Sequence, residues 1–248
     1  MLWPFILLSK KRYIANTYQT DPDAKPKQKS MGVVLSRRDN AQIVKRIFGG
    51  VIDRLLNGAD VAGAVTFVKE ALSDLVAGKV PVSDLVVSKN LGSEYADPDR
   101  IAHAVLARRM EERDPGSAPA VGDRVPYVYI VPPGGHVKGT LQGDRIEHPD
   151  HLDGAQLDFE HYIMCQVMKP VAQVFALVVH DIPGCKLTRE AMDAMHIVHL
   201  NECAGDVEKA RRKDDAVKMK EVIRLIFEDS MKECERARLG VKDISSYF

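Results

Sequence analysis

The 248-residue sequence has few cysteines, and nothing in it marks a secreted or membrane-spanning chain. Its four cysteines are scattered without a Cys-x-x-Cys pair, whereas a disulfide framework needs denser cysteines in a smaller chain. No run of about 18 apolar residues occurs, so we expect no transmembrane helix and no membrane partner. The apolar residues 2–8 lack the flanking signals of a secretory leader, and a buried strand explains them better. These absences favour an intracellular, reducing compartment.

Common catalytic and metal-binding motifs are also missing. The chain has no Gly-x-x-x-x-Gly-Lys-[Ser/Thr] loop, no Gly-x-Gly-x-x-Gly and no Gly-x-Ser-x-Gly. His196, His199 and Cys203 would share one helix face, but they lack the close paired spacing of zinc ligands, so a half-buried face is favoured over a zinc site. Asp214 and Asp215 are adjacent on a predicted helix and would point apart, which favours a solvated face over a metal-binding pair.

Charge of one sign is not in excess, because 35 Lys and Arg balance 35 Asp and Glu. That balance argues against a nucleic-acid partner only until the charges are placed along the chain. Residues 1–50 hold ten Lys or Arg and three Asp, a local charge of +7. The remaining residues therefore sum to −7. A basic N-terminal segment joined to a mildly acidic body is compatible with a local grip on a polyanion.

The N-terminal segment predicts a long antiparallel β-hairpin. Residues 5–18 are rich in aromatic and β-branched side chains, residues 21–26 contain turn-forming Pro and Asp, and residues 31–35 would form the returning strand. Asp39 is predicted to cap the following helix. Apolar side chains between residues 43 and 56 recur at i, i+3 and i+4, which indicates one buried helix face.

Downstream, helical patterns predominate. Helices are predicted to begin at Asp60 and at Asp97-Pro98. A further helix is predicted at 158–179, kinked near Pro170, and charged helices over 188–239. Strands are predicted at 85–87, 125–131 and 140–146. With 45% hydrophobic residues the chain can bury a core. The predicted fold class is α+β, with a basic antiparallel hairpin, a mainly helical region with a small β element, and a helical C-terminal extension.

The sharpest local motif is Lys10-Lys11-Arg12-Tyr13, at the end of an apolar strand. Three cations on an extended backbone alternate between faces and can straddle a phosphate backbone. Tyr13 adds a flat ring with a hydroxyl group. Taken alone, such a cluster is more often a solvated strand end, because basic clusters are weakly specific.

Six motifs in a fixed order change this interpretation. They occupy residues 4–13, 32–40, 113–119, 122–128, 143–149 and 162–170. Together they closely resemble the C-terminal part of family B DNA-directed DNA polymerases, from the end of the palm through the thumb. Residues 143–149 and Asn40 are most similar to the versions in large double-stranded DNA viruses.

The resemblance implies a domain organisation and a role. The expected divisions are 1–36 as the C-terminal edge of the palm, 37–180 as the thumb, 181–240 as a charged helical extension and 241–248 as a tail. The implied role is binding of primer–template duplex during replication, in the nucleus or at a viral replication site in the host cytoplasm. Backbone contacts of this kind hold a duplex without reading its sequence.

The resemblance also implies which residues touch DNA. The implied duplex-binding residues are Lys10, Lys11, Arg12, Tyr13, Arg37, Arg38, Arg124 and Lys169. The first four would lie near the primer terminus and Arg37 and Arg38 at the junction of palm and thumb. Asp39 would cap the thumb helix and orient a neighbouring Arg.

Catalysis is not expected from this chain alone. The family transfers nucleotides with two metal ions held by palm aspartates, one in an Asp-Thr-Asp motif that this chain lacks, as it lacks the fingers and exonuclease. We therefore expect no catalytic residue and no bound cofactor here, with Mg²⁺ serving the complete polymerase. The chain would be a fragment or a split subunit partnered by a catalytic half encoded elsewhere. The alternative is a stand-alone, non-catalytic duplex-binding or interaction protein derived from a polymerase thumb.

The C-terminal tail resembles a sliding-clamp-binding peptide. Ile244, Tyr247 and Phe248 match the apolar positions of Gln-x-x-[Ile/Leu]-x-x-aromatic-aromatic, while Val241 replaces the expected Gln. One 3₁₀-like turn would bring the three apolar side chains onto one face. A frayed terminus with two aromatic residues explains the pattern equally well.

Overall fold

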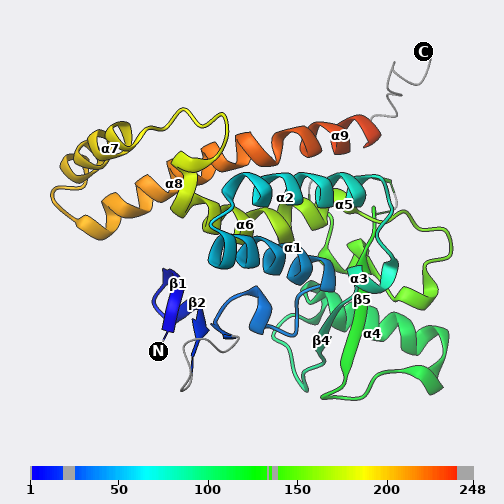
Figure 1. Cartoon of the computed structure of the whole chain (residues 1–248). Helices are drawn as coiled ribbons and strands as arrows, with labels where there is room; N and C mark the ends of the chain where they lie inside the picture. Colours follow the sequence, from blue (N-terminus) through cyan, green and yellow to red (C-terminus); the bar gives the residue numbers. More distant parts are fainter. Residues whose placement is uncertain (1, 19–25, 133, 136–138, 239–248) are drawn as a thin grey trace, which may run out of the picture.

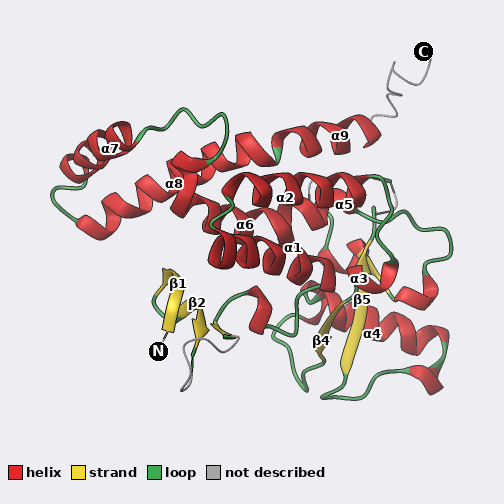
Figure 2. Cartoon of the chain, viewed as in Figure 1, coloured by secondary structure: helices red, strands yellow, loops and turns green. Residues whose placement is uncertain are grey.

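The computed structural model describes residues 2–18, 26–132, 134–135 and 139–238. Within them, two small antiparallel sheets accompany a larger set of helices (Figures 1 and 2). The predicted α+β class is confirmed. Helices α8 and α9 cover α2 on one side of the molecule, and the two sheets lie on the other (Figure 1).

The first sheet has three strands rather than the two predicted. Its order is β1 (Leu2–Ser9), β2 (Arg12–Thr17) and β3 (Lys27–Met31). The single strand predicted over residues 5–18 is wrong, because the chain reverses at Lys10-Lys11 and Ser9 pairs with Arg12. Lys11 takes a left-handed φ of 64°, which closes the tight turn.

The returning strand also lies elsewhere than predicted. It ends at Met31, and Gly32 has a φ of +64° that a residue with a side chain rarely adopts. A 3₁₀ turn over Val34–Ser36 then leads toward the first helix. Most of the predicted turn at residues 21–26 lies outside the described residues.

Strand β1 buries only one of its faces, in line with the period-2 alternation of a strand. Ile6 and Leu8 pack against the core. Trp3, Phe5 and Leu7 point the other way and are 62%, 54% and 57% exposed. The predicted buried strand is therefore half-buried in this chain, at the edge of its sheet.

Two helices form the centre of the core. Helix α1 (Gln42–Asp53) buries the predicted apolar face, and a π-helical turn over Arg54–Gly58 follows it. Helix α2 (Val61–Val76) begins as predicted, since the Asp60 carboxylate accepts a 2.7 Å hydrogen bond from the amide of Gly63.

The second sheet is built from β4 (Val87–Asn90), β5 (Arg124–Tyr129) and β6 (Ile146–Glu147). The strand predicted at 85–87 starts later, because Val82–Leu85 forms the short helix α3. The helix predicted from Asp97-Pro98 divides into a 3₁₀ turn over Pro98–Arg100 and helix α4 (Ala102–Arg113).

The apolar stretch Phe159–Asp181 crosses the core as a discontinuous helix. It consists of α5 (Phe159–His161), a π-helical segment (Tyr162–Val167), α6 (Met168–Phe175) and a 3₁₀ segment (Ala176–Asp181). The irregularity falls just before Pro170, whose missing N–H interrupts the helical ladder. By length and composition alone this stretch could span a membrane. Half of its apolar window is buried within the fold, where α6 packs against α1 and α8 as a core helix does.

The C-terminal region is helical, as predicted. Helices α7 (Arg189–Glu202), α8 (Val207–Ile226) and α9 (Glu228–Arg238) follow one another. Val222, Ile226, Phe227 and Cys234 belong to the same core cluster as α1 and α2. The first half of α8 extends away from the body with α7 packed against it (Figure 1).

The α7–α8 pair corrects the prediction of a solvated face at Asp214. The Asp214 side chain is only 7% exposed and accepts from Nδ1 of both His196, at 2.5 Å, and His199, at 2.6 Å. Burial raises the pKa of Asp214, but the hydrogen bonds from His199 and His196 outweigh it and leave that pKa below its usual value. Its neighbour Asp215 is exposed, as expected.

Candidate nucleic-acid interface

The β1–β2 turn presents the predicted basic motif in a different geometry. Lys10 and Lys11 lie at the tip of the turn and are exposed, rather than alternating along an extended strand. Arg12 is the first residue of β2 and is half-buried. Tyr13 pairs with Leu7 on one side and Met31 on the other, in the middle strand of the sheet.

Arg12 joins the first sheet to helix α6. Its Nη2 donates to Oε1 of Gln173 at 3.1 Å, and its Nε donates to the carbonyl oxygen of Gly32 at 3.3 Å. Both acceptors are neutral. The guanidinium therefore keeps its net charge while its position is set by two segments distant in sequence.

Three of the predicted residues surround one open hollow of about 460 Å³. Arg12 comes from β2, Arg37 from the loop before α1, and Lys169 from α6. Gln166, Gln173 and Asn40 add polar groups to its lining. The structure thus brings Lys169 beside two arginines that lie more than a hundred positions earlier in the sequence.

The loop between β3 and α1 is organised by an ion pair rather than by a helix cap. The N-cap of α1 is Ala41, so the prediction that Asp39 caps this helix is wrong. Asp39 instead accepts two hydrogen bonds from Arg37, from Nε at 2.9 Å and Nη2 at 2.7 Å. These side-chain hydrogen bonds raise the pKa of Arg37 and lower the pKa of Asp39. Asp39 therefore holds the guanidinium of Arg37 beside the loop.

Arg124 lies at the start of β5 and reaches back to this loop. Nε donates to Oγ of Ser88 at 2.9 Å, and Nη1 donates to Oδ1 of Asn90 at 2.8 Å. Nη2 donates to the carbonyl oxygens of Ser88 and, at 3.2 Å, of Arg38. The second sheet is thereby tied to the backbone of the basic loop.

Several of the predicted cations have no carboxylate close to them. Within the described residues, no ion pair is formed by Lys10, Lys11, Arg38 or Lys169, and all four side chains are exposed. Among the residues that the structure describes, Arg37 is the one predicted contact that pairs with an acid. The result is a surface of unneutralised positive charge that faces solvent, which is the property that phosphate binding requires.

Motif 143–149 has a structural role that local sequence patterns did not reveal. Glu147, only 8% exposed, accepts one hydrogen bond from each terminal nitrogen of Arg113, both at 3.0 Å, and lies 3.8 Å from Arg109. Burial raises the pKa of Glu147, but the hydrogen bond from Arg113 helps to bring it below its usual value. A Cβ at Gly143 would lie 2.8 Å from Val105 of α4, so only glycine permits this approach. The motif therefore fastens β6 to α4.

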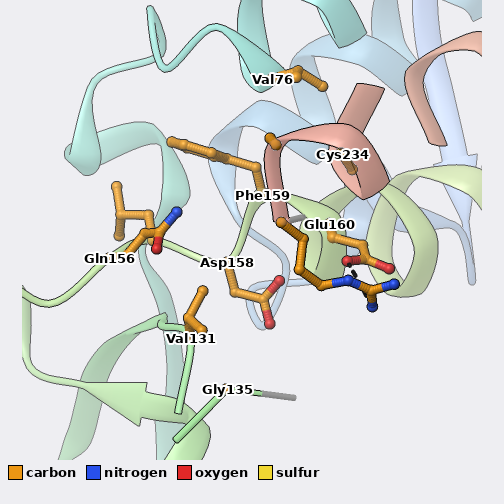
Figure 3. A pocket seen from close by; sticks show the side chains of 11 residues that line it. Val76, Val131, Gly135, Gln156, Asp158, Phe159, Glu160 and Cys234 are labelled. Atoms are coloured by element: carbon orange, nitrogen blue, oxygen red, sulfur yellow. Dashed lines mark ion pairs between the residues drawn. The ribbon is translucent and has the colours of Figure 1, made fainter. Parts of the chain in front are cut away.

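A second, smaller cavity of about 230 Å³ lies between α2, the segment 156–160 and α9 (Figure 3). Val76, Phe159 and Cys234 form its apolar wall. Glu160 and Arg238 approach to 3.8 Å at its edge. Burial raises the pKa of the Cys234 thiol to about 11, so this cysteine stays protonated near neutral pH.

No metal site emerges from the part of the chain that the structure describes. Among those residues, no group of three or more His, Cys, Asp or Glu side chains is arranged to hold a metal ion. His196 and His199 turn toward Asp214 instead. The predicted clamp-binding residues Ile244, Tyr247 and Phe248 lie outside the described residues.

Comparison with known proteins identifies the family of this chain. The family model described as DNA polymerase family B matches residues 1–178. The chain is 44% identical to the DNA polymerase of Pyramimonas orientalis virus, over 99% of this chain and 20% of that protein. It is also 44% identical to the DNA polymerase of Acanthamoeba polyphaga mimivirus, over 71% of this chain and 10% of that protein.

A cellular protein and a solved structure are also similar to this chain. The DNA polymerase delta catalytic subunit of Caenorhabditis elegans is 38% identical over 72% of this chain and 16% of its own length. The family B DNA polymerase of Pyrobaculum calidifontis shares the fold, with a TM-score of 0.52 and 22% identity over 68% of this chain and 21% of that one. The chain thus spans about a fifth or less of the relatives it matches. It belongs to DNA polymerase family B.

Proposed function

We propose that this chain grips primer–template duplex during DNA replication, as part of a family B DNA-directed DNA polymerase whose nucleotidyl transfer is carried out elsewhere. The observation that carries the proposal is the hollow shared by Arg12, Arg37 and Lys169. Lys10 and Lys11 extend the positive surface from the β1–β2 turn. The site of action would be an intracellular site of replication, in the nucleus or in a viral replication compartment.

The chemistry of this surface suits duplex DNA of any sequence. Exposed Lys and Arg side chains bind phosphates and release counterions, which gives affinity without base readout. A replicative enzyme needs that property, because it must translocate along every sequence. Tyr13, predicted to lie near the primer terminus, is half-buried in the middle strand beside these cations.

Catalysis would require residues beyond those described. Two-metal nucleotidyl transfer needs a carboxylate cluster, and the described residues contain no suitable group of ligands. The Mg²⁺ ions of the complete polymerase would therefore be held by its catalytic part. The chain on its own should bind DNA without extending a primer.

The exposed face of β1 is the proposed contact with that catalytic part. Trp3, Phe5 and Leu7 lie on the free edge strand of the first sheet. An apolar face on an open edge favours covering by further strands or helices. Under this proposal residues 1–36 are the palm edge, 37–180 the thumb and 181–240 an extension packed on it. The tail residues Ile244, Tyr247 and Phe248 would bind a sliding clamp, and deletion of 241–248 should then abolish clamp binding.

Fluorescence anisotropy with a labelled primer–template duplex tests the proposal. The purified chain should bind, and the logarithm of its affinity should fall linearly with the logarithm of salt concentration. Primer extension should appear only after the polymerase segment that carries the Asp-Thr-Asp motif is added. Absence of salt-dependent binding would refute the duplex grip. Binding without any reconstituted extension would favour a stand-alone duplex-binding protein.

A further inference from the structure

Resting on the proposed duplex grip, we infer that Arg124 is a positioning residue that acts through Arg38, which is the phosphate-binding side chain of the loop at residues 37–39. Both arginines were predicted to contact DNA directly. The geometry assigns them different tasks.

The donors of Arg124 are nearly all in use. A guanidinium carries five N–H groups, and four hydrogen bonds from Arg124 reach Ser88, Asn90 and the Arg38 carbonyl. A bidentate phosphate contact needs two parallel donors. Arg124 could form one only by releasing β4 or the loop.

The loop that Arg124 holds is also fixed at its other end. Asn40 donates through Nδ2 to the carbonyl oxygen of Val34 at 3.3 Å, and the Arg37 amide donates to the same oxygen at 3.2 Å. Arg38 lies between these two anchorages. Its backbone is therefore held in place while its side chain stays exposed.

Arg38 is the cation of this loop that remains available to a ligand. Arg37 is occupied by Asp39 through two hydrogen bonds and is neutralised by it. Among the described residues, no ion pair is formed by the Arg38 side chain. Fixing the backbone beneath an exposed cation reduces the entropy lost when that side chain meets a phosphate.

A lysine at position 124 should not be able to do what Arg124 does. The three nitrogens of Arg124 reach acceptors on β4 and on the loop at the same time. An ammonium group offers its donors from a single atom and cannot span them. A phosphate contact, in contrast, would tolerate Lys, which binds phosphate as a point charge.

A double-mutant cycle on the 248-residue chain tests the inference. Duplex affinity is measured by anisotropy across salt concentrations for the native chain, Arg38→Ala, Arg124→Ala, Arg124→Lys and the double variant Arg38→Ala/Arg124→Ala. Thermal unfolding of each variant confirms that it is folded. Arg236→Ala, an exposed arginine on α9, is the matched control.

We expect Arg38→Ala to weaken binding about tenfold and to reduce the salt slope by about one. Arg124→Ala and Arg124→Lys should each reproduce most of that loss, and the double variant should bind no more weakly than Arg38→Ala. If the losses of affinity in the two single variants multiply in the double variant, or if Arg124→Lys binds as tightly as the native chain, the inference is overturned. Arg124 would then be an independent phosphate contact. If the native chain shows no salt-dependent binding, the proposed duplex grip is itself refuted, and the inference about Arg124 falls with it.

Discussion

The guanidinium of Arg12 donates to the side-chain oxygen of Gln173 at 3.1 Å, across 161 positions of the sequence. This contact joins the second strand of the first sheet to helix α6. Both elements line the hollow that contains Arg12, Arg37 and Lys169. The candidate interface is therefore a property of the assembled fold and not of any one motif.

Gln173→Ala should weaken duplex binding while leaving its salt dependence unchanged. The substitution removes a hydrogen bond worth about 1 kcal/mol, so we expect a loss of affinity of about threefold to tenfold. No charge is lost, so the number of released counterions should stay the same. Anisotropy titrations at several salt concentrations measure both quantities. Gln166→Ala, which lines the same hollow, is the control, and an equal loss there would contradict a specific role for Gln173.

Glu147→Gln should destabilise the fold by about 2 kcal/mol at neutral pH, because it removes a charged acceptor from Arg113. The pKa of Glu147 is lowered in the folded state. Its stabilisation is therefore present above the unfolded pKa of about 4.3 and is lost as pH falls through the folded pKa. Urea unfolding at pH 7 and at pH 3 should show the difference from the native chain shrinking in acid.

The exposed Glu112, which precedes Arg113 on helix α4, provides the control for this prediction. Glu112→Gln should change the free energy of unfolding by less than about 0.5 kcal/mol. Equal effects of the two substitutions, or a Glu147→Gln effect that grows in acid, would contradict the role assigned to Glu147.

Asp214→Asn should loosen α7 from α8. One buried carboxylate accepts from both His196 and His199, and an amide oxygen cannot serve two donors as well. Hydrogen exchange should therefore accelerate in residues 189–202, while α1 and α2 keep their protection. Asp215→Asn, at the exposed neighbouring position, should leave exchange unchanged. Unchanged protection of α7 in Asp214→Asn would show that the His–Asp contacts do not hold this helix.

Trp3 offers a direct probe of the exposed β1 face, since it is the only tryptophan in the chain and is 62% exposed. Its fluorescence should resemble that of a hydrated indole in the isolated chain. Adding a tryptophan-free variant of the catalytic part should shift the emission to shorter wavelength as the face is covered. Co-elution of the two parts without a shift would contradict the proposed contact.

The sequence was most informative where structure depends on local pattern. The buried face of α1 and the capping of α2 by Asp60 follow from apolar spacing and from a single side chain. The turn at Lys10-Lys11 was missed because neither residue is Gly or Asn, although Lys11 adopts the left-handed conformation those residues favour.

What the local patterns did not predict depends on which partner each side chain finds in the folded chain. Asp39 has an Arg two positions before it, and that ion pair took the place of the expected cap. Asp214 is buried because α7 folds back and presents two histidines to it. Arg124 donates its hydrogen bonds to β4 and to a loop 86 positions away, which no local pattern indicates.

The salt dependence of duplex binding by a triple variant tests the central claim most directly. Lys10→Ala, Lys11→Ala and Arg38→Ala are combined in one chain, and Lys218→Ala, Lys220→Ala and Arg236→Ala in a charge-matched control. If the duplex lies against the β1–β2 turn and the loop at 37–39, the slope of log affinity against log salt concentration should fall by about three in the first variant, since each phosphate contact contributes about 0.9. The slope of the control should hardly change. Equal slopes in the two variants would contradict a grip centred on this surface.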